Sequence, residues 1–482
     1  MGSAARRVSD AVREARIAAG AWSRTPLAGR LRVVRALRFE IAERAERLAA
    51  AASSPAKGIA ETLVSEVLPL ADACRFAECE APRVLATRQL SRRGRPLWSS
   101  RTDVQVAREP WGVVLVVAPS NYPLFLPGVH ALQALAAGNA VVVKPGPGGS
   151  AALTELAAAW AAAGLPGGLL QVLGEDQERV AEAIDAGVDH VVLTGSERTG
   201  KAVLADLAAR AVPATMELSG ADAVFVLPGA DPGFVARALA FGLAWNGGAT
   251  CIAPRRVFVA RPLASELEAA LRTAIELRGC TALDGQRASA AGEIVREALQ
   301  SGGRIVAGGL DAHGRLSGPT VLADVAHTTR AATADLFAPV AVVFPYDQLD
   351  ASERLARTCP YALGASMFGP EAAARALGAR LDVGVVTIND VIVPTADPRV
   401  PFGGRAGSGY GTTRGAEGLL AMTRPKALAW RRGRFRPHFD PTRPGDERIF
   451  LGTLRVAHSR TVAGRVRAAA ELIRALARRG RT

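Results

Sequence analysis

Cysteine, lysine and long apolar runs are all scarce in this sequence of 482 residues, and the scarcity excludes several classes of protein. The five cysteines are Cys74, Cys79, Cys251, Cys280 and Cys359. They are odd in number, scattered and without a CxxC pair, which excludes a disulfide framework and, with no histidine cluster, a zinc site. The longest Ala/Leu-rich run, residues 151–165, is interrupted by Glu155, so no membrane-spanning helix is expected.

The first sixteen residues, MGSAARRVSDAVREAR, are charged and lack an apolar signal segment, which predicts a cytoplasmic protein. Apolar residues make up 49% of the chain and charged residues 22%, which is typical of a folded globular protein and excludes disorder. A chain of this length is expected to form two or three domains with a large buried interior.

Positive charge is the one excess, and it is concentrated at the C-terminal end. The formal net charge is +14, of which residues 431–482 supply +10 through fourteen arginines against four acidic residues. The preceding 430 residues carry the remaining +4. The body of the chain therefore gives no electrostatic reason to expect nucleic-acid binding.

Hydrophobic periodicity organises the rest of the chain. Apolar residues at helical spacing predict one long amphipathic helix over residues 26–50, whereas the polar stretch 91–110 is expected to be an extended excursion. From residue 112 onward, short apolar runs alternate with alanine-rich stretches, a pattern typical of parallel sheets covered by helices on both faces. The expected strands are 112–117, 140–143, 169–173, 190–193 and 214–218 in a first block, and 223–227, 256–260, 340–344 and 384–388 in a second.

Polar residues follow several expected strands, where parallel sheets bind their ligands. Asn121 in PSNYP either projects an amide donor into a cleft or serves a proline-flanked turn. Lys144 in VVVKPGPGG suits a phosphate or a ribose hydroxyl, but a solvated surface lysine is an equal alternative. LTGSERTG, which contains Gly195 and Ser196, has the order strand, glycine, helix but lacks both the P-loop and the GxGxxG fingerprint.

Glu217 and Cys251 complete the set of candidate catalytic residues. Glu217 in MELSG ends a strand between apolar neighbours, where a raised pKa would suit a general base, although such a glutamate is more often solvated or ion-paired. Cys251 in WNGGATCIAP is either a buried structural thiol or a nucleophile. No single one of these motifs decides a function.

Together, the motifs resemble those of the NAD(P)-dependent aldehyde dehydrogenase superfamily, in the family's order and spacing from about residue 25 to about residue 428. They are EPWGVVLVVAPSNYP, ALAAGNAVVVKP, LTGSERTG, MELSG, NGGATC, DLFAPV and PFGGRAGSGYG. The resemblance implies an α/β fold with a Rossmann-like dinucleotide-binding domain, an α/β catalytic domain and a small β oligomerisation arm. The expected boundaries are 1–90 and 111–220 for the dinucleotide-binding domain, 221–410 for the catalytic domain, 91–110 and 411–430 for the arm, and 431–482 for a basic extension.

The resemblance also implies catalytic roles. Cys251 is the expected nucleophile that forms a thiohemiacetal with the aldehyde, and Asn121 and the Cys251 N–H are the expected oxyanion hole. Hydride transfer to the nicotinamide of NAD or NADP then leaves a thioester. Glu217 is expected to activate the water that hydrolyses this thioester to the carboxylic acid.

The cofactor contacts that the resemblance implies lie at five positions. Lys144 resembles the family's contact to the adenosine ribose, and Gly195 and Ser196 match the segment that meets the pyrophosphate at a helix N-terminus. Asp335 and Phe337, in DLFAPV, match the residues around the nicotinamide ribose.

Some positions depart from the family pattern. Pro147 replaces a glutamate that grips the ribose hydroxyls, and the loss of this charge predicts that NADP is tolerated or preferred. Asp335 is one methylene shorter than the usual glutamate, which predicts a weakened hold on the cofactor. Thr412 and Thr413 stand where an Arg-Glu pair is common.

The last fifty or so residues have no counterpart in the family pattern. The segment VAGRVRAAAELIRALARRG is expected to form a helix with one apolar stripe at Val462, Val466, Ala469, Ile473 and Leu476. The favoured interpretation is a packing or oligomer helix with a solvated basic face, and docking to nucleic acid or a membrane is a less favoured alternative. Because the strands of the arm need a pairing partner, we expect a homodimer or a higher oligomer.

Two other functions remain as alternatives. The first is an acylating, coenzyme A-dependent aldehyde dehydrogenase, which Glu217 disfavours because acylating relatives typically lack that glutamate. The second is a non-catalytic binding protein that acts through the basic tail, which the joint presence of Cys251, Glu217 and Asn121 disfavours. The aldehyde itself is not identified by the sequence, although Tyr122, Phe125 and Trp245 hint at an apolar or aromatic one.

Overall fold

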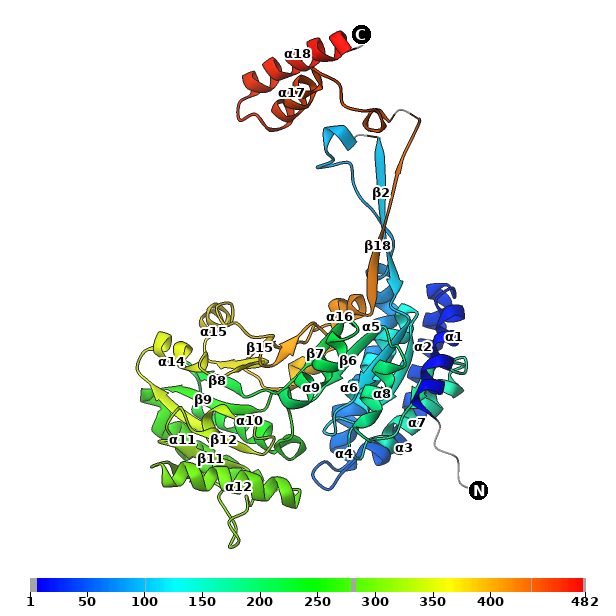
Figure 1. The fold of residues 1–482 in the computed structure, drawn as a ribbon. Coiled ribbons are helices and arrows are strands. Elements are labelled where there is room, and N and C mark those ends of the chain that lie inside the picture. Colours follow the sequence, from blue (N-terminus) through cyan, green and yellow to red (C-terminus); the bar gives the residue numbers. More distant parts are fainter. Residues whose placement is uncertain (1–6, 100, 279–282, 435, 480–482) are drawn as a thin grey trace. The chain divides into compact units, whose positions relative to one another are not determined.

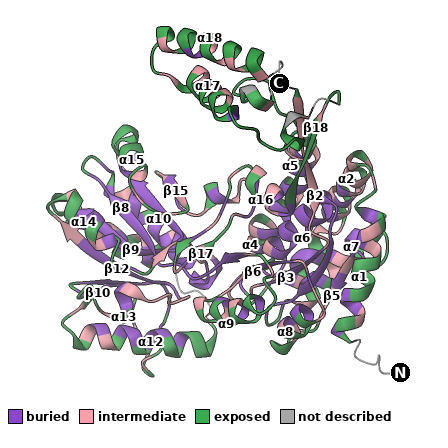
Figure 2. Cartoon of the chain, turned by 45° about the horizontal axis from the view of Figure 1, so that its top comes forward, coloured by how far each residue is buried: buried purple, intermediate pink, exposed green. Residues whose placement is uncertain are grey.

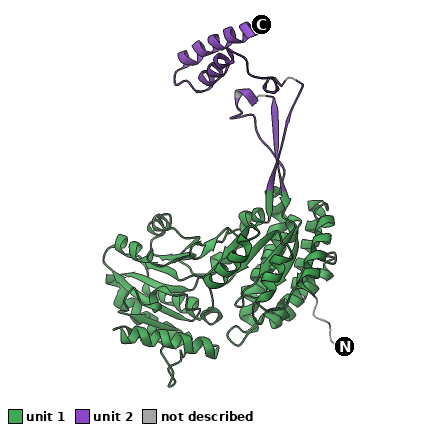
Figure 3. Ribbon diagram, viewed as in Figure 1, with its two compact units in different colours: residues 1–86, 109–424 green, residues 87–108, 425–482 purple. Residues whose placement is uncertain are grey.

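A computed structural model describes residues 7–99, 101–278, 283–434 and 436–479 of the chain. Contacts within the chain group it into two compact units (Figure 3). The larger unit comprises residues 1–86 and 109–424, and the smaller unit comprises residues 87–108 and 425–482. Every helix in the described residues is too short or too polar to span a bilayer.

The first half of the larger unit is built on a six-stranded sheet in the order β17-β7-β6-β3-β4-β5 (Figure 1). Its strands are β3 (Val113–Val117), β4 (Ala140–Lys144), β5 (Leu170–Val172), β6 (His190–Thr194), β7 (Ala214–Glu217) and β17 (Gly409–Tyr410). The first five run parallel, and β17 pairs antiparallel with β7. β3 and β4 are buried throughout, which explains their unbroken apolar sequences. The five strands expected in this block are confirmed, with ends within one residue.

Helices pack around this sheet and form one large apolar core with it. They are α1 (Val8–Trp22), α2 (Leu27–Glu43), α3 (Ala45–Ala52), α4 (Ile59–Thr62), the π-helical turn η1 (Leu63–Val67), α5 (Leu68–Val84), α6 (Phe125–Ala137), α7 (Ser150–Ala162), α8 (Glu178–Asp185), α9 (Glu197–Ala208) and α16 (Gly415–Ala421). α6 is the most deeply buried of them, since twelve of its thirteen residues are inaccessible.

The expectation of a single long helix over residues 26–50 is wrong. The chain leaves helical geometry at Arg44 (φ −100°, ψ 12°), where α2 ends and α3 begins. α2 packs mainly against α5, whereas α3 packs against α7. The apolar spacing continues through the break, so the pattern alone does not reveal it.

The second half of the larger unit is built on a seven-stranded sheet in the order β10-β11-β12-β9-β8-β14-β15. Its strands are β8 (Asp222–Val226), β9 (Pro254–Ala260), β10 (Arg304–Ala307), β11 (Thr320–Ala323), β12 (Val340–Tyr346), β14 (Gly364–Phe368) and β15 (Val385–Ile388). β10 is antiparallel and the others are parallel. The four expected strands correspond to β8, β9, β12 and β15, while β10, β11 and β14 were not expected.

Successive residues of these strands point into two cores on opposite faces of the second sheet. Phe225 and Phe258 belong to one core, and Val224 and Val257 belong to the other. The surrounding helices are α10 (Pro232–Ala244), α11 (Arg261–Arg278), α12 (Gly285–Gln300), α13 (Arg330–Thr333), α14 (Leu349–Ala356) and α15 (Glu371–Gly378). Figure 2 shows the buried strands between more exposed helices.

The chain passes between the two sheets twice, at residues 218–221 and again at residues 389–408. The two passages are hydrogen-bonded to each other. Leu218 N donates to Ser408 O at 3.1 Å, and Ser408 Oγ donates to Ser219 O at 2.6 Å. The end of β7 and the start of β17 are thereby fixed together.

The smaller unit contains a three-stranded sheet and a helical hairpin. The sheet has the order β1-β2-β18, formed by β1 (Arg88–Gln89), β2 (Thr102–Pro110) and β18 (Thr423–Arg431). Two helices follow, α17 (Asp446–His458) and α18 (Val462–Arg479). α18 confirms the expected terminal helix, whereas α17 was not expected because its start is embedded in a segment rich in proline, arginine and glycine.

Candidate active site

Cys251 lies in the loop between α10 and β9, and the preceding turn fixes its position. Residues 246–248 all have positive φ, with values of 52°, 58° and 74°. A Cβ on Gly248 would lie 2.4 Å from Pro339 N, and a Cβ on Gly220 would lie 2.3 Å from Cys251 O. The sequence NGGATC therefore forms a turn in which glycine is required both for conformation and for close backbone approach.

The loop that contains Asn121 is hydrogen-bonded directly to the Cys251 loop. Asn121 Nδ2 donates to Ala249 O at 2.8 Å, and Asn246 Nδ2 donates to Asn121 O, also at 2.8 Å. The hydroxyls of Tyr122 and Thr250 are 2.7 Å apart. These bonds bring together two motifs that are far apart in the sequence, PSNYP and NGGATC, and Asn121 itself is buried.

A buried ion pair supports the Asn121 loop from behind. Lys57 Nζ pairs with Glu66 and also donates to Asn121 O at 3.1 Å. Glu66 Oε2 accepts the backbone N–H groups of Leu124 at 2.7 Å and Phe125 at 2.9 Å. Such a pair persists in a core only when hydrogen bonds satisfy both charges, as they do here. Sequence reasoning missed it, although the rarity of lysine in this arginine-rich chain was an available signal.

Glu217, at the end of β7, is buried with its carboxylate held by two threonine hydroxyls. Thr194 Oγ1 donates to Glu217 Oε2 at 3.1 Å, and Thr413 Oγ1 donates to Glu217 Oε1. The pairing of Gly409 with Glu217 between β17 and β7 brings the chain after β17 to this place. Thr413, which departs from the family pattern, is thus a neutral donor to the carboxylate.

The thiol of Cys251 has its pKa raised to about 12. Burial is the main cause, and the negative charges of Glu217 and Asp222 add to it, while Arg414 acts in the opposite direction. The thiol is therefore protonated at neutral pH. Cys74, Cys79 and Cys359 are also free thiols, and Cys280 lies outside the described residues.

Arg414 is a buried guanidinium that sequence reasoning did not single out. It has a positive φ of 55°, lies with its Cζ 4.2 Å from the centre of the Phe402 ring, and donates through Nη1 to Thr395 O. Phe402 belongs to a small apolar cluster with Ile252 and Leu363, and Cys251 packs against this cluster. The positive charge of Arg414 acts on the thiol and lowers its pKa.

Lys144 and the first turn of α7 adjoin a carboxylate that was also missed. Burial lowers the pKa of Lys144, and the charge of Glu175 opposes that shift. Glu175 accepts the backbone N–H groups of Gly148 at 2.8 Å and Ser150 at 3.0 Å, and its pKa is lowered by its hydrogen bonds there. The turn after β4 is thus capped by an acid from the loop after β5.

Gly195 and Ser196 lie at the start of α9. Ser196 is the N-cap, and its Oγ accepts the Thr199 N–H at 3.2 Å. Gly195 N donates to Glu217 O at 2.9 Å, which ties this turn to the strand that carries Glu217. The N-cap of α9 is thus a neutral side chain, and the first turn contains one acid, Glu197.

Asp335 and Phe337 lie in the loop before β12. Asp335 is largely buried, its pKa is raised by burial, and its Oδ1 has no hydrogen-bond partner among the described residues. Phe337 has a positive φ of 46°. The neighbouring Arg255 anchors this loop, because it donates to Ala338 O and, at 2.5 Å, to Gly248 O of the Cys251 turn.

A cavity of about 460 Å³ adjoins the Asn121 loop and the turn that precedes Cys251. Among the candidate residues, Asn121 and Phe337 line it, together with the turns at 147–148 and 246–247. Lys144, Gly195, Ser196, Asp335, Glu217 and Cys251 are not among its lining residues.

The sequence of this chain matches the aldehyde dehydrogenase family over residues 2–428. The chain belongs to the aldehyde dehydrogenase family. The α/β fold expected from its motifs is confirmed, and the protein is an oxidoreductase that acts on aldehydes.

Three aldehyde dehydrogenase relatives illustrate the extent of the similarity. The 4,4'-diapolycopene aldehyde oxidase of Methylomonas sp is 32% identical, over 92% of this chain and 85% of that protein. The NADP-dependent glyceraldehyde-3-phosphate dehydrogenase of Bacillus halodurans C-125, solved with NADP, has a TM-score of 0.82 and 29% identity over 88% of this chain and 91% of that one. The indole-3-acetaldehyde dehydrogenase of P. syringae, solved with NAD+, has a TM-score of 0.81 and 26% identity over 89% of this chain and 90% of that one.

Proposed function

We propose that this aldehyde dehydrogenase oxidises an aldehyde to its carboxylic acid with NAD+ or NADP+, through a thioester on Cys251 that water hydrolyses. The observation that carries the proposal is the hydrogen bonding of the Asn121 loop to the Cys251 loop through Ala249 and Asn246. It ties the Asn121 amide to Ala249, two residues before Cys251 in the sequence, and the pKa of that thiol responds to Glu217.

The chemistry of the candidate cofactor-binding residues fits a dinucleotide. Asp335 Oδ1 is a buried acceptor without a protein partner, which suits a ribose hydroxyl, and Phe337 lines the same cavity as Asn121. Lys144 would contact the adenosine ribose, and the start of α9 at Gly195 and Ser196 would face the pyrophosphate. When bound, NAD(P)+ accepts the hydride that leaves the thiohemiacetal, which becomes the thioester.

Cys251 attacks the aldehyde carbon, and as the C–S bond forms its proton passes to Glu217, whose charge acts on the thiol, and from there to solvent before hydrolysis. Because its pKa lies near 12, the free thiolate is scarce at neutral pH, and proton transfer must accompany the attack. Asn121 Nδ2 carries two hydrogens and uses one of them on Ala249 O. We assign the second hydrogen, with the Cys251 N–H, to the developing oxyanion.

Glu217 is the proposed base for hydrolysis of the thioester. Its carboxylate accepts hydrogen bonds from Thr194 and Thr413, which leaves lone pairs free for a water molecule. The water gives one proton to Glu217 and its oxygen attacks the thioester carbon, and the products are the carboxylic acid and the Cys251 thiol.

The test is reduced-nicotinamide absorbance with aldehydes, NAD+ and NADP+, in the absence of coenzyme A. Wild type is expected to turn over to free acid, C251A to be inactive, and C74A, which alters a free thiol of α5, to retain activity. E217Q is expected to release one equivalent of reduced cofactor rapidly and then stop, because the acyl-enzyme accumulates. Turnover that requires coenzyme A would favour the acylating alternative, and activity in C251A would refute the mechanism.

We propose an apolar aldehyde as the substrate. A groove runs beside the exposed side chains of Val64, Leu68 and Val393, with charged residues on its rim, and it shares Phe76 and Pro398 with a small inner cavity of about 10 Å³. Arg414 and Phe125 line that cavity, and Arg414 stacks on Phe402, a member of the apolar cluster against which Cys251 packs. The Methylomonas relative is named for an aldehyde of 4,4'-diapolycopene.

A homologous series of straight-chain aldehydes tests the substrate class. Each added methylene that becomes buried contributes about 0.8 kcal/mol, so kcat/KM is expected to rise by about fourfold per carbon until the groove is filled. The substitution L68S, at the groove, should reduce the increase in kcat/KM per added carbon. L277S, which replaces an exposed leucine on α11, should leave that increase unchanged. A flat series in the wild type would contradict the apolar assignment.

We also propose a separate function for each domain. Residues 1–90 and 111–220 would bind the dinucleotide, residues 221–410 would supply the nucleophile, and β2 and β18 would pair with a second copy to form a dimer or a higher oligomer. The free thiols of the described cysteines are consistent with a reducing compartment such as the cytoplasm.

A further inference from the structure

The hairpin of α17 and α18 buries its small residues and exposes its large apolar ones. Gly452 packs against Leu472, where a Cβ would lie 3.0 Å from Leu472 Cβ, and Ala468 is buried. The exposed large apolar residues of the two helices are Phe450 (58% exposed), Leu451 (46%), Leu454 (57%), Val462 (75%), Val466 (64%), Ile473 (66%) and Leu476 (49%). Figure 2 shows how much of both helices is accessible. Val462, Val466, Ile473 and Leu476 belong to the apolar stripe that we expected to be a packing face. The structure leaves these four side chains exposed.

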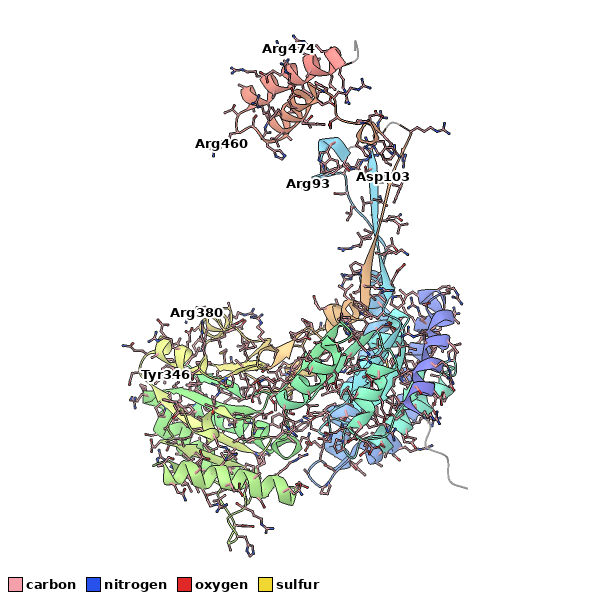
Figure 4. All side chains as sticks on the ribbon, in the orientation of Figure 1. Arg93, Asp103, Tyr346, Arg380, Arg460 and Arg474 are labelled. Carbon is pink, nitrogen blue, oxygen red and sulfur yellow. The ribbon has the colours of Figure 1, made fainter. Side chains whose placement is uncertain are left out.

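Arginines are sequence neighbours of several of these residues: Arg465 and Arg467 flank Val466, and Arg474 follows Ile473. Residues 446–479 contain eight arginines and three acidic residues. Two of the eight make ion pairs within the hairpin, Arg455 with Glu471 at 3.6 Å and Arg479 with Asp446 at 3.0 Å. Figure 4 labels Arg460, at the turn between the helices, and Arg474, on α18. The hairpin thus combines exposed aliphatic and aromatic side chains with a large excess of positive charge.

We propose that the α17–α18 hairpin docks this protein on an anionic membrane surface. Phe450, Leu454, Val466 and Ile473 would enter the boundary between headgroups and acyl chains, while the flanking arginines bind lipid phosphates. This mode of binding requires no membrane-spanning helix. Each arginine near an anionic surface strengthens binding about fivefold.

The combination of positive charge and exposed apolar side chains favours a membrane over two other binding partners, a second copy of the hairpin and nucleic acid. A second hairpin would bring an equal positive charge against the first, so association of two copies through this face is opposed by repulsion. Nucleic acid would satisfy the arginines but would leave the apolar stripe in water. An anionic membrane satisfies both features at once.

Co-sedimentation of the full chain with vesicles tests the proposal. We expect binding to vesicles of phosphatidylcholine mixed with phosphatidylglycerol, much weaker binding to phosphatidylcholine alone, and weakening by salt. Replacing Arg467, Arg474 and Arg478 by glutamine should reduce binding about a hundredfold. The double variant V466S/I473S should lose about tenfold or more at constant charge, whereas the control L277S should bind like the wild type.

Folding of each variant is checked by helical circular dichroism and by activity on a short, water-soluble aldehyde, since neither readout depends on the membrane. Absence of sedimentation by a folded wild type would overturn the proposal, as would equal sedimentation of V466S/I473S. Binding to duplex DNA in preference to vesicles, or a change in molecular mass of V466S/I473S without any vesicle binding in the wild type, would also overturn it. The first result assigns the hairpin to nucleic acid and the second to an oligomer interface.

Discussion

Glu175 supplies a carboxylate next to the turn that contains Pro147. The resemblance to the family leads us to expect a glutamate at position 147, and proline provides no charge there. The two oxygens of Glu175 accept the N–H groups of Gly148 and Ser150 at 2.8 and 3.0 Å, and its charge acts on Lys144. If Lys144 contacts the adenosine ribose, a 2′-phosphate would lie in the field of this acid. The absence of a charge at Pro147 is therefore offset from elsewhere in the chain, and we expect the wild type to accept both NAD and NADP.

The substitution E175Q removes one negative charge and keeps the side chain's size. Two unit charges about 4 Å apart interact by about 1 kcal/mol in bulk water and about 4 kcal/mol near a protein surface. Glu175 is partly exposed and screened by salt, so a repulsion of about 1–2 kcal/mol is reasonable. Its removal should raise the ratio of kcat/KM for NADP over NAD by about 5- to 30-fold.

The assay measures kcat/KM for both cofactors with one aldehyde, at low and high ionic strength. The gain in E175Q should shrink at high salt, because the effect is electrostatic. E178Q is the matched control, since Glu178 also acts on Lys144 but makes no hydrogen bond to the turn before α7. A ratio that is unchanged or lower in E175Q, at either salt concentration, would refute the placement of the 2′-phosphate beside α7.

Three other changes test the environment of the site. R414M removes the charge that lowers the pKa of Cys251, so the pH at which iodoacetamide begins to alkylate this thiol rapidly should move upward. An unchanged dependence of the alkylation rate on pH would contradict the electrostatic interaction between Arg414 and Cys251. K57M leaves Glu66 buried without its partner and should reduce the free energy of unfolding by about 3–5 kcal/mol, measured in denaturant; K57M/E66L should recover part of it, and no loss in K57M would disprove the role of the ion pair. D335E should lower the Michaelis constant of the cofactor, and a higher constant would show that the loop around this residue does not accommodate the longer side chain.

The sequence predicted much of the fold because its buried parallel strands are short continuous apolar runs. β3 and β4, for example, consist almost entirely of valine, alanine and leucine, a pattern that few other structures produce. β14, with the sequence GASMF, lacks β-branched residues and was missed even though it is buried throughout. Its strand conformation is set by its neighbours β8 and β15 and not by its own composition.

The candidate site was predictable only where a motif carried it. Cys251, Asn121 and Glu217 lie in segments whose spacing is characteristic, whereas Glu175 and Arg414 act through contacts that no local pattern encodes. Glu175 reaches a turn 25 residues away, and Glu66 reaches the Asn121 loop 58 residues away. Such pairings depend on tertiary structure, so a single sequence gives no direct signal for them.

The double passage of the chain between the two sheets has a mechanical consequence. A single connection would allow the half built on one sheet to rotate in many directions relative to the half built on the other. Here two connections are hydrogen-bonded to each other through Leu218, Ser219 and Ser408, so they resist torsion together. Hinge bending about the axis that runs through both connections therefore remains the least costly movement of the two halves. A cut in either connection would still leave the halves joined by the other.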